Sequence, residues 1–187
     1  MANKIKYGIS QLFYAKASIS TAGTATYGTP VAIPGGVSIT LDSESETNPF
    51  YADNIVYYTS VSNNGYSGSF EVALVPDSFL ADIFGDVTAT NGLMYEKADV
   101  EPAHFALLFQ TEGNNGPTRH VFYNCVATRP SVSSQTKESS VTPATETVNI
   151  TANAIYNSAI TASVFKGKAE YATTAYSSWY TAVQQPT

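Results

Sequence analysis

Charged residues are scarce in this sequence. Asp, Glu, Lys and Arg make up 13% of its 187 residues, whereas an average soluble domain has about 25%. The surface of a free monomer usually keeps its charge, while protein interfaces lose Lys, Glu and Asp and gain aromatic residues. The 13 Tyr and 9 Phe of this chain therefore predict extensive contact surfaces.

Basic residues are missing from one half of the chain. Residues 17–96 contain nine acids and not one Lys or Arg, while residues 1–16 contain three Lys and no acid. An acidic face repels the phosphates of nucleic acid, which argues against a groove that grips DNA. It suits a wall past which DNA slides without sticking, and it also suits an ordinary solubilising surface. Charge alone favours the ordinary surface and leaves the wall open.

Cysteine, long apolar runs and a secretory signal are also lacking. The single Cys excludes a disulfide framework, and no Cys/His cluster has the spacing of a structural zinc site. No run of 18 apolar residues is present, and the first ten residues, MANKIKYGIS, lack the apolar core of a signal peptide. We therefore expect a soluble cytoplasmic product from a reducing compartment, with no membrane contact.

No catalytic arrangement stands out. The chain has two histidines, His104 and His120, and no nucleophile-elbow, phosphate-loop or zinc-protease motif. His120 and Cys125 are five residues apart and point to opposite faces of one strand, so a buried apolar Cys125 is favoured over a pairing with His104 across strands. Glu44 and Glu46 fit solvated acids better than a calcium or glycosidase pair. We predict no enzyme, and no catalytic, metal-binding or cofactor-binding residues.

Strand-forming segments dominate the chain. Val, Ile, Tyr, Phe and Thr are concentrated in short stretches between Gly, Pro and Asn. We predict one domain, residues 1–187, with a mainly β fold: an antiparallel β-sandwich or half-barrel of seven or eight short strands with one or two short helices. Extended arms or loops are predicted at 18–36, 42–54 and 131–144. The predicted strands are Tyr7–Ala17, Val37–Leu41, Ile55–Val61, Ser67–Val75, Leu93–Lys97, Ala103–Thr111, Thr118–Thr128 and Glu146–Ala154.

The clearest local pattern is a hairpin. Asn63-Asn64-Gly65 supplies residues that tolerate positive φ between the strands Ile55–Val61 and Ser67–Val75. In the second strand apolar and polar residues alternate, with Phe70 and Glu71 as neighbours, so one face is buried and the other is polar. The first strand carries large groups on both faces, which predicts that a neighbouring subunit covers it.

A short helix is predicted directly after this hairpin. In Pro76–Gly85, Asp77 or Ser78 can cap the first turn, four apolar residues share one face, and the final Gly can close the last turn. A second short helix is predicted near Trp179. Because the chain has no Lys between positions 16 and 97, the sheet edges lack charges that block pairing, which favours pairing with another chain.

Four segments in a fixed order carry a resemblance to a known family. They are PFYADNIVYYTSVSNNGYSGSFEVALVPDSFLADIFG, EPAHFALLFQTEG, TRHVFYNCVATRPSVSSQTKESS and TETVNITA. Together they are similar to the major tail tube proteins of siphophages, the phages with long non-contractile tails, that infect Gram-positive hosts. The similarity extends from Lys4 to Trp179, and its motifs are structural segments with no catalytic signature.

The resemblance implies a β-sandwich with a flanking helix and a structural role. Family members form hexameric rings that stack into a hollow tube, and DNA passes through the lumen without sequence-specific binding. The implied partners are other copies of the chain and the tape measure, tail terminator and distal tail proteins, and no cofactor is implied. The implied location is the virion tail, after synthesis in the cytoplasm of the bacterial host.

Two sets of residues and one acid are assigned to surfaces on this basis. We expect Glu71 to face the lumen, with an acid on the outer surface as the equally weighted alternative. The predicted ring interface is Ile55, Val56, Tyr57 and Tyr58. The predicted ring-stacking residues are Glu44, Glu46, Phe50 and Tyr51. The alternative function is a secreted carbohydrate-binding or adhesive β-sandwich whose exposed aromatics contact sugars, although the missing signal counts against it.

Overall fold

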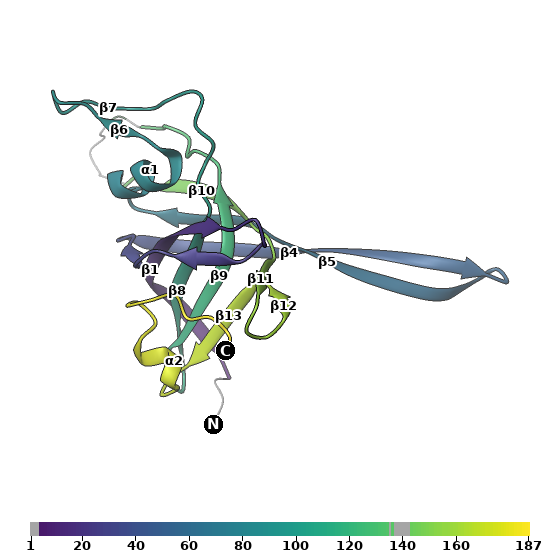
Figure 1. The fold of residues 1–187 in the computed structure, drawn as a ribbon. Helices are drawn as coiled ribbons and strands as arrows, with labels where there is room; N and C mark the ends of the chain where they lie inside the picture. Colours follow the sequence, from purple (N-terminus) through teal and green to yellow (C-terminus); the bar gives the residue numbers. More distant parts are fainter. Residues whose placement is uncertain (1–3, 135, 137–142) are drawn as a thin grey trace.

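One large antiparallel sheet organises the protein. The computed structural model describes residues 4–134, 136 and 143–187, in which nine strands form this sheet (Figure 1). The strand order is β2-β1-β8-β9-β10-β5-β4, and β3 and β13 pair with β1 and β9 outside this path. Its members are β1 (Lys6–Ile19), β2 (Ala25–Tyr27), β3 (Val31–Ala32), β4 (Gly36–Ala52), β5 (Ile55–Val72), β8 (Phe105–Gly113), β9 (Thr118–Ala127), β10 (Glu146–Ala152) and β13 (Lys166–Glu170).

The remaining elements are short. Two small two-stranded sheets and two helices complete the described part of the chain, and the mainly β antiparallel class with two short helices is confirmed. Figure 1 shows the helices at opposite ends of the body. These elements are β6 (Val87–Thr88) with β7 (Met94–Tyr95), β11 (Ile155–Asn157) with β12 (Ala162–Val164), α1 (Asp77–Phe84) and α2 (Thr174–Ser177).

The sheet divides at β9. The first half of β9 pairs with β13, where Val121 lies opposite Gly167, and its second half pairs with β10, where Ala127 lies opposite Ile150. β10 then continues past β9 and pairs with β5 over its whole length. The sheet therefore branches at β9, with β13 on one branch and β10 and β5 on the other.

Both faces of the central strands are buried. In β8, Phe105 and Leu107 pack in one cluster with α1, and Leu108 packs on the opposite face under the C-terminal segment that contains Trp179. All four side chains are at most 2% exposed. The first part of β8 is therefore a continuous run of apolar residues, as expected for a strand that is covered on both faces.

α1 packs its apolar face onto the larger cluster. Phe79 and Ile83 are buried, and Gly85 ends the helix with a left-handed conformation at φ 71°. The predicted helix is confirmed, but the N-cap by Asp77 or Ser78 is wrong. Pro76 is the N-cap residue, no side chain caps the helix, and the carbonyl of Pro76 accepts the N–H groups of the first turn instead.

The predicted hairpin turn is wrong. The chain reverses at Asp53-Asn54, where φ is 52° and 63°, the two positive values that a tight hairpin turn requires. β5 therefore runs without interruption from Ile55 to Val72 and pairs with β4. Ile55–Val61 lies opposite residues 47–52, not opposite Ser67–Val75. The predicted projecting loop at 42–54 is also wrong as a loop, because residues 42–52 form the outer half of β4.

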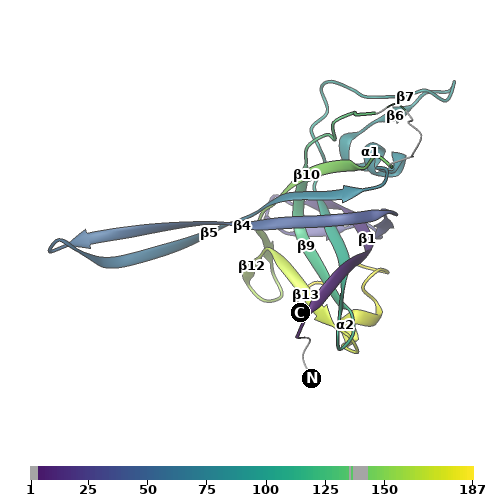
Figure 2. The same cartoon turned by 180° about the vertical axis from the view of Figure 1, so that it is seen from behind.

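The Asn64-Gly65 pair forms a bulge. The β4–β5 register passes from Ser43 opposite Tyr66 to Ser45 opposite Asn63, so β5 contains one extra residue at this point. Beyond the bulge the hairpin has no further partner strand, because the pairing of β10 ends at Tyr66. We call residues 44–65 the arm, and Figures 1 and 2 show it projecting far from the body.

The other two predicted loops differ from each other. Residues 18–36 contain β2 and β3, which both fold back and pair with β1. The segment therefore stays on the body and does not form an arm. The predicted loop at 131–144 lies partly outside the described residues; its described positions, 131–134, 136 and 143–144, are in neither helix nor strand.

Substitution of Gly68 tests the close approach of β4 and β5. Gly68 has φ 156°, and an added Cβ would lie 2.0 Å from the carbonyl oxygen of Thr40. We expect Gly68→Ala to lower the free energy of unfolding by about 3 kcal/mol, since it adds both backbone strain and overpacking. The control is Gly92→Ala, where φ is 85° and nothing lies within 4 Å, with an expected loss of about 1 kcal/mol. Equal losses in urea unfolding would contradict this account.

Candidate interaction surfaces

A polar surface covers one side of three adjacent strands. β4, β5 and β10 pair in register, so side chains from the three strands form straight rows. Phe70 and Val148, which lie between these rows, point the other way and are buried. We call the polar surface the hydroxyl face. Its rows are Ser38, Glu71 and Thr147; Thr40, Ser69 and Asn149; and Asp42, Ser67 and Thr151.

The hydroxyl face carries acids and no base. Six of its nine residues are Ser or Thr, one is Asn, and Asp42 and Glu71 are acids. Short hydroxyl groups bind water and neutral partners, and they offer no positive charge to a phosphate. The surface is therefore polar enough to stay hydrated and unsuited to holding nucleic acid tightly.

Glu71 occupies the middle of the first row. Its carboxylate accepts hydrogen bonds from the hydroxyl groups of Thr145 and Ser38. These two hydrogen bonds lower the pKa of Glu71, so its negative charge persists to lower pH. The prediction that Glu71 lies on the polar side of its strand is correct, and its assignment to a lumen stays a prediction.

The arm exposes apolar side chains at its tip. The sequence assigned Ile55, Val56, Tyr57 and Tyr58 to one surface and Phe50 and Tyr51 to another. The structure places all six on the arm, where Phe50 lies opposite Tyr58 and Tyr51 lies opposite Val56. Each of the six is at least 50% exposed in this single chain. Glu44 and Glu46 lie on the same arm, nearer the body.

The arm tip is apolar on both of its faces. Opposite residues of an antiparallel pair share a face and successive residues alternate, except at a bulge. The register shift between Phe50 and Tyr51 leaves Tyr57 as an extra residue on β5, so Phe50, Tyr58 and Ile55 lie on one face. Tyr51 and Val56 lie on the other. Contiguous exposed apolar surface of this kind marks a site of contact with another molecule. Because both faces are apolar, a partner that covers one face alone leaves the other in water.

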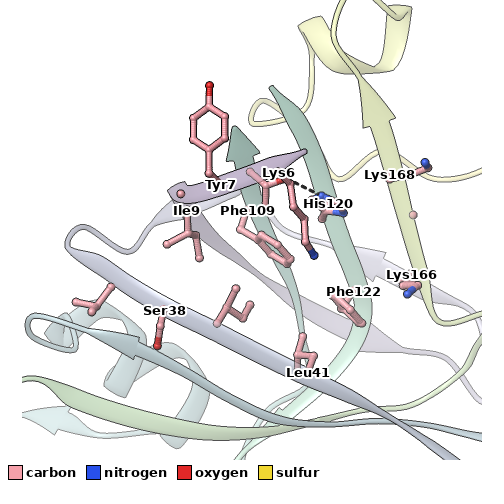
Figure 3. A pocket seen from close by; sticks show the side chains of 15 residues that line it. Lys6, Tyr7, Ile9, Ser38, Leu41, Phe109, His120, Phe122, Lys166 and Lys168 are labelled. Carbon is pink, nitrogen blue, oxygen red and sulfur yellow. Dashed lines mark hydrogen bonds between the residues drawn. The ribbon is translucent and has the colours of Figure 1, made fainter. Parts of the chain in front are cut away.

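A hollow lies on the body between the strand edges. We call it the trough: it has a volume of about 710 Å³ and is lined by residues of β1, β4, β8, β9 and β13 (Figure 3). Apolar residues form part of its lining, and three lysines and one histidine add polar groups. The apolar residues are Ile9, Val37, Ile39, Leu41, Phe109 and Phe122, and the polar groups are those of Lys6, Lys166, Lys168 and His120.

His120 contributes no positive charge to the trough near neutral pH. Its ring stacks on Phe109 with the centroids 5.0 Å apart, and its Nε2 lies 3.1 Å from Oγ1 of Thr111. Burial, together with the nearby lysines, lowers the pKa of His120 to about 4. The lysines are therefore the charged groups of this hollow, and none of its lining residues is an acid.

The remaining candidates for chemistry are each held by other partners. Cys125 is fully buried, its thiol donates to the carbonyl of Phe122, and burial raises its pKa to about 12, so it is a poor nucleophile. His104 is hydrogen-bonded through Nδ1 to Asn124. Within residues 4–134, 136 and 143–187, no group of three His, Cys, Asp or Glu residues is placed to hold a metal ion. No helix in this part of the chain is long and apolar enough to cross a membrane.

Comparison with known proteins identifies a family. The model of a family described as phage tail tube protein matches residues 2–183. The match therefore includes the arm, the hydroxyl face and the trough. The comparison with curated proteins gave no match.

Proposed function

The chain belongs to the phage tail tube protein family and is a structural subunit of a tail tube, and on this premise we propose how its copies assemble. Six copies close into a ring, and rings stack into a hollow tube. DNA passes through this tube to the host. The hydroxyl face is the observation that carries the proposal. It supplies a hydrated, acidic surface without bases, as a wall facing moving DNA requires.

Ring closure follows from the open edge of the sheet. Among the described residues, β4 lies at the end of the strand order and β13 pairs only with β9, so each copy offers backbone groups at two different edges. A head-to-tail contact between different edges forms a ring when its rotation closes. In the proposed ring, strands of adjacent copies continue one another, and the hydroxyl faces together form the inner wall.

Axial growth is assigned to the arm. Its exposed apolar residues include the predicted ring-interface and ring-stacking sets, and we propose that they contact copies outside the subunit's own ring. Such a contact repeats without limit, so tube length must be set by partners. We propose the tape measure, tail terminator and distal tail proteins for this role.

Electron microscopy of the purified protein tests the assembly. We expect concentrated protein to form rings or hollow tubes of uniform width in negative stain. A protein that stays monomeric even after addition of tail-initiation components would contradict the proposal. That outcome would favour the sugar-binding alternative, with the exposed aromatics of the arm as the first candidates for sugar contact.

A lysine on the hydroxyl face should slow DNA passage. We expect particles built with Glu71→Lys to release DNA several-fold more slowly than wild type, since each ring then presents a cluster of new bases to the phosphates. The delay should shrink at high salt because screening weakens the attraction. DNA release from complemented particles, followed with a DNA-binding dye, measures the effect.

Two controls separate the charge from other effects of this substitution. Glu71→Gln removes the acid and adds no base, and Glu101→Lys makes the same charge change at an exposed position outside the hydroxyl face. We expect both controls to release DNA at close to the wild-type rate. Equal rates of DNA release for Glu71→Lys and Glu101→Lys would contradict the assignment of Glu71 to the lumen.

A further inference from the structure

We infer that the trough of one copy receives the arm tip of a second copy. The inference rests on the proposed function, since it requires copies to assemble, and it adds the acceptor surface for the arm. Three properties of the described residues carry it: the shape of the two surfaces, their charges, and the direction in which the arm projects.

The shapes of tip and trough are complementary. The tip has apolar side chains on both faces, so a flat partner would leave one face in water. The trough is a hollow whose walls come from several strands: Leu41 on β4 lies on one side, and Phe109 and Phe122 on β8 and β9 lie on another (Figure 3). An inserted hairpin tip would meet apolar residues on both faces.

The charges of the two surfaces are opposite. The arm tip contains the acid Asp53 and no base, and Glu44 and Glu46 lie nearer the body on the same arm. The trough contains three lysines and no acid among its lining residues. Such complementarity steers the approach of two copies and fixes their relative orientation.

The lysines that line the trough can also bind aromatic rings. Lys166 Nζ already lies 4.5 Å from the ring centroid of Tyr66, at the base of the arm of its own chain. Lys168 pairs only loosely with Glu170, at 3.6 Å on the exposed surface, a type of contact that contributes little. Tyr57 and Tyr58 of an incoming tip would bring further rings within reach of these ammonium groups.

The direction of the arm requires a second copy. Figures 1 and 2 show the arm projecting from the body as a straight extension of β4 and β5. About ten residues of each strand lie in the arm, which at about 3.3 Å per residue gives a length of about 30 Å. The tip is thus carried away from the trough of its own chain, whose β4 residues lie near the start of that strand.

Disulfide trapping between two variants tests the inference. One variant carries Tyr57→Cys on the arm, and the other carries Lys168→Cys on the trough and a tag that changes its mass. Native Cys125 stays in both, since it is fully buried. The two variants are mixed, assembled and mildly oxidised, and mixed-mass dimers are separated on a non-reducing gel. The control replaces Lys168→Cys by Lys97→Cys, an exposed lysine outside the trough.

We expect mixed dimers to be at least about tenfold more abundant with Lys168→Cys than with Lys97→Cys, because proximity raises the effective concentration of the second thiol. Polymers that form normally but give equal yields with both lysine positions would overturn the inference and leave the proposed function intact. Failure of the wild-type protein to polymerise with or without initiation components would overturn both.

A charge exchange provides the second measurement. Lys166→Glu with Lys168→Glu should reduce polymer formation at least about tenfold, since like charges then face each other across the contact. Adding Asp53→Lys at the arm tip of the same chain should restore part of it, because the tip then carries a base opposite the new acids. Lys16→Glu with Lys97→Glu is the matched control outside the trough. Loss without restoration, or equal loss in the control, would contradict the charge pairing.

Discussion

We expect Val56→Ser with Tyr58→Ser to leave the single chain folded and to stop its polymerisation. These side chains are 50% and 63% exposed, so they add little to the stability of the monomer. Burying them in a neighbouring copy would contribute about 3 kcal/mol to each contact, and their loss would raise the critical concentration more than about a hundredfold. Light scattering and electron microscopy follow polymerisation, and thermal unfolding checks the fold.

Exposed apolar residues outside the arm supply the matched control. Leu74 and Leu93 are 67% and 61% exposed on the body, so Leu74→Ser with Leu93→Ser removes a similar amount of apolar surface. We expect this control to polymerise at close to the wild-type concentration. Normal polymerisation of the arm variant, or equal failure of the control, would show that the tip is not a specific contact.

Alanine at Phe79 should cause the largest loss of monomer stability. Phe79 is fully buried, and its ring meets four others: those of Tyr14, Phe70, Phe84 and Phe105, with centroids 5.0 to 6.0 Å away. We expect Phe79→Ala to lower the free energy of unfolding by about 4 kcal/mol, since it removes this contact area and leaves a cavity. Urea unfolding measures the loss.

Leu80→Ala is the comparison for this substitution. Leu80 lies on the same helix, α1, and is only partly buried against the same cluster. Both variants place Ala in the helix, so helix propensity changes in the same direction and the difference reports packing. We expect a loss of about 1 kcal/mol for Leu80→Ala. Similar losses for the two variants would mean that α1 is held to the sheet by something other than the Phe79 ring.

Patterns of burial along single elements were predictable from the sequence. The alternation from Phe70 to Val72 and the apolar face of Pro76–Gly85 led directly to β5 and α1. Each of these patterns arises from contacts that one element makes with the core, so neighbouring residues carry the signal. The polar position of Glu71 was predictable for the same reason.

The turn could not be chosen correctly because two segments compete for it. Asn63-Asn64-Gly65 and Asp53-Asn54 both contain residues that tolerate positive φ. The choice depends on whether Ile55–Val61 pairs with the residues that precede it or with those that follow it. Pairing with the preceding residues is favoured because β5 then pairs with β4 along the full length of both strands. The large groups on both faces of Ile55–Val61 were the available signal, since they fit a strand that leaves the body.

The rows of the hydroxyl face and the trough could not be derived from the sequence. Glu71 and Thr147 share a row only because β5 and β10 pair in one register, and a shift by one residue would turn every side chain to the other face. The trough joins Ile9 of β1 to Lys168 of β13, which lie at opposite ends of the chain. Such contacts follow from tertiary pairing and leave no local pattern.

The bulge at the base of the arm determines how much conformational entropy assembly must remove. Gly65 is buried there with φ 123°, and an added Cβ would lie 2.6 Å from the carbonyl oxygen of Ala152 on β10. The arm is thus seated against a third strand where it leaves the body, and its two strands are paired from there to Ala52 opposite Ile55. Its backbone is ordered before any neighbour arrives, so the ordering of a long flexible segment is not subtracted from the affinity between copies.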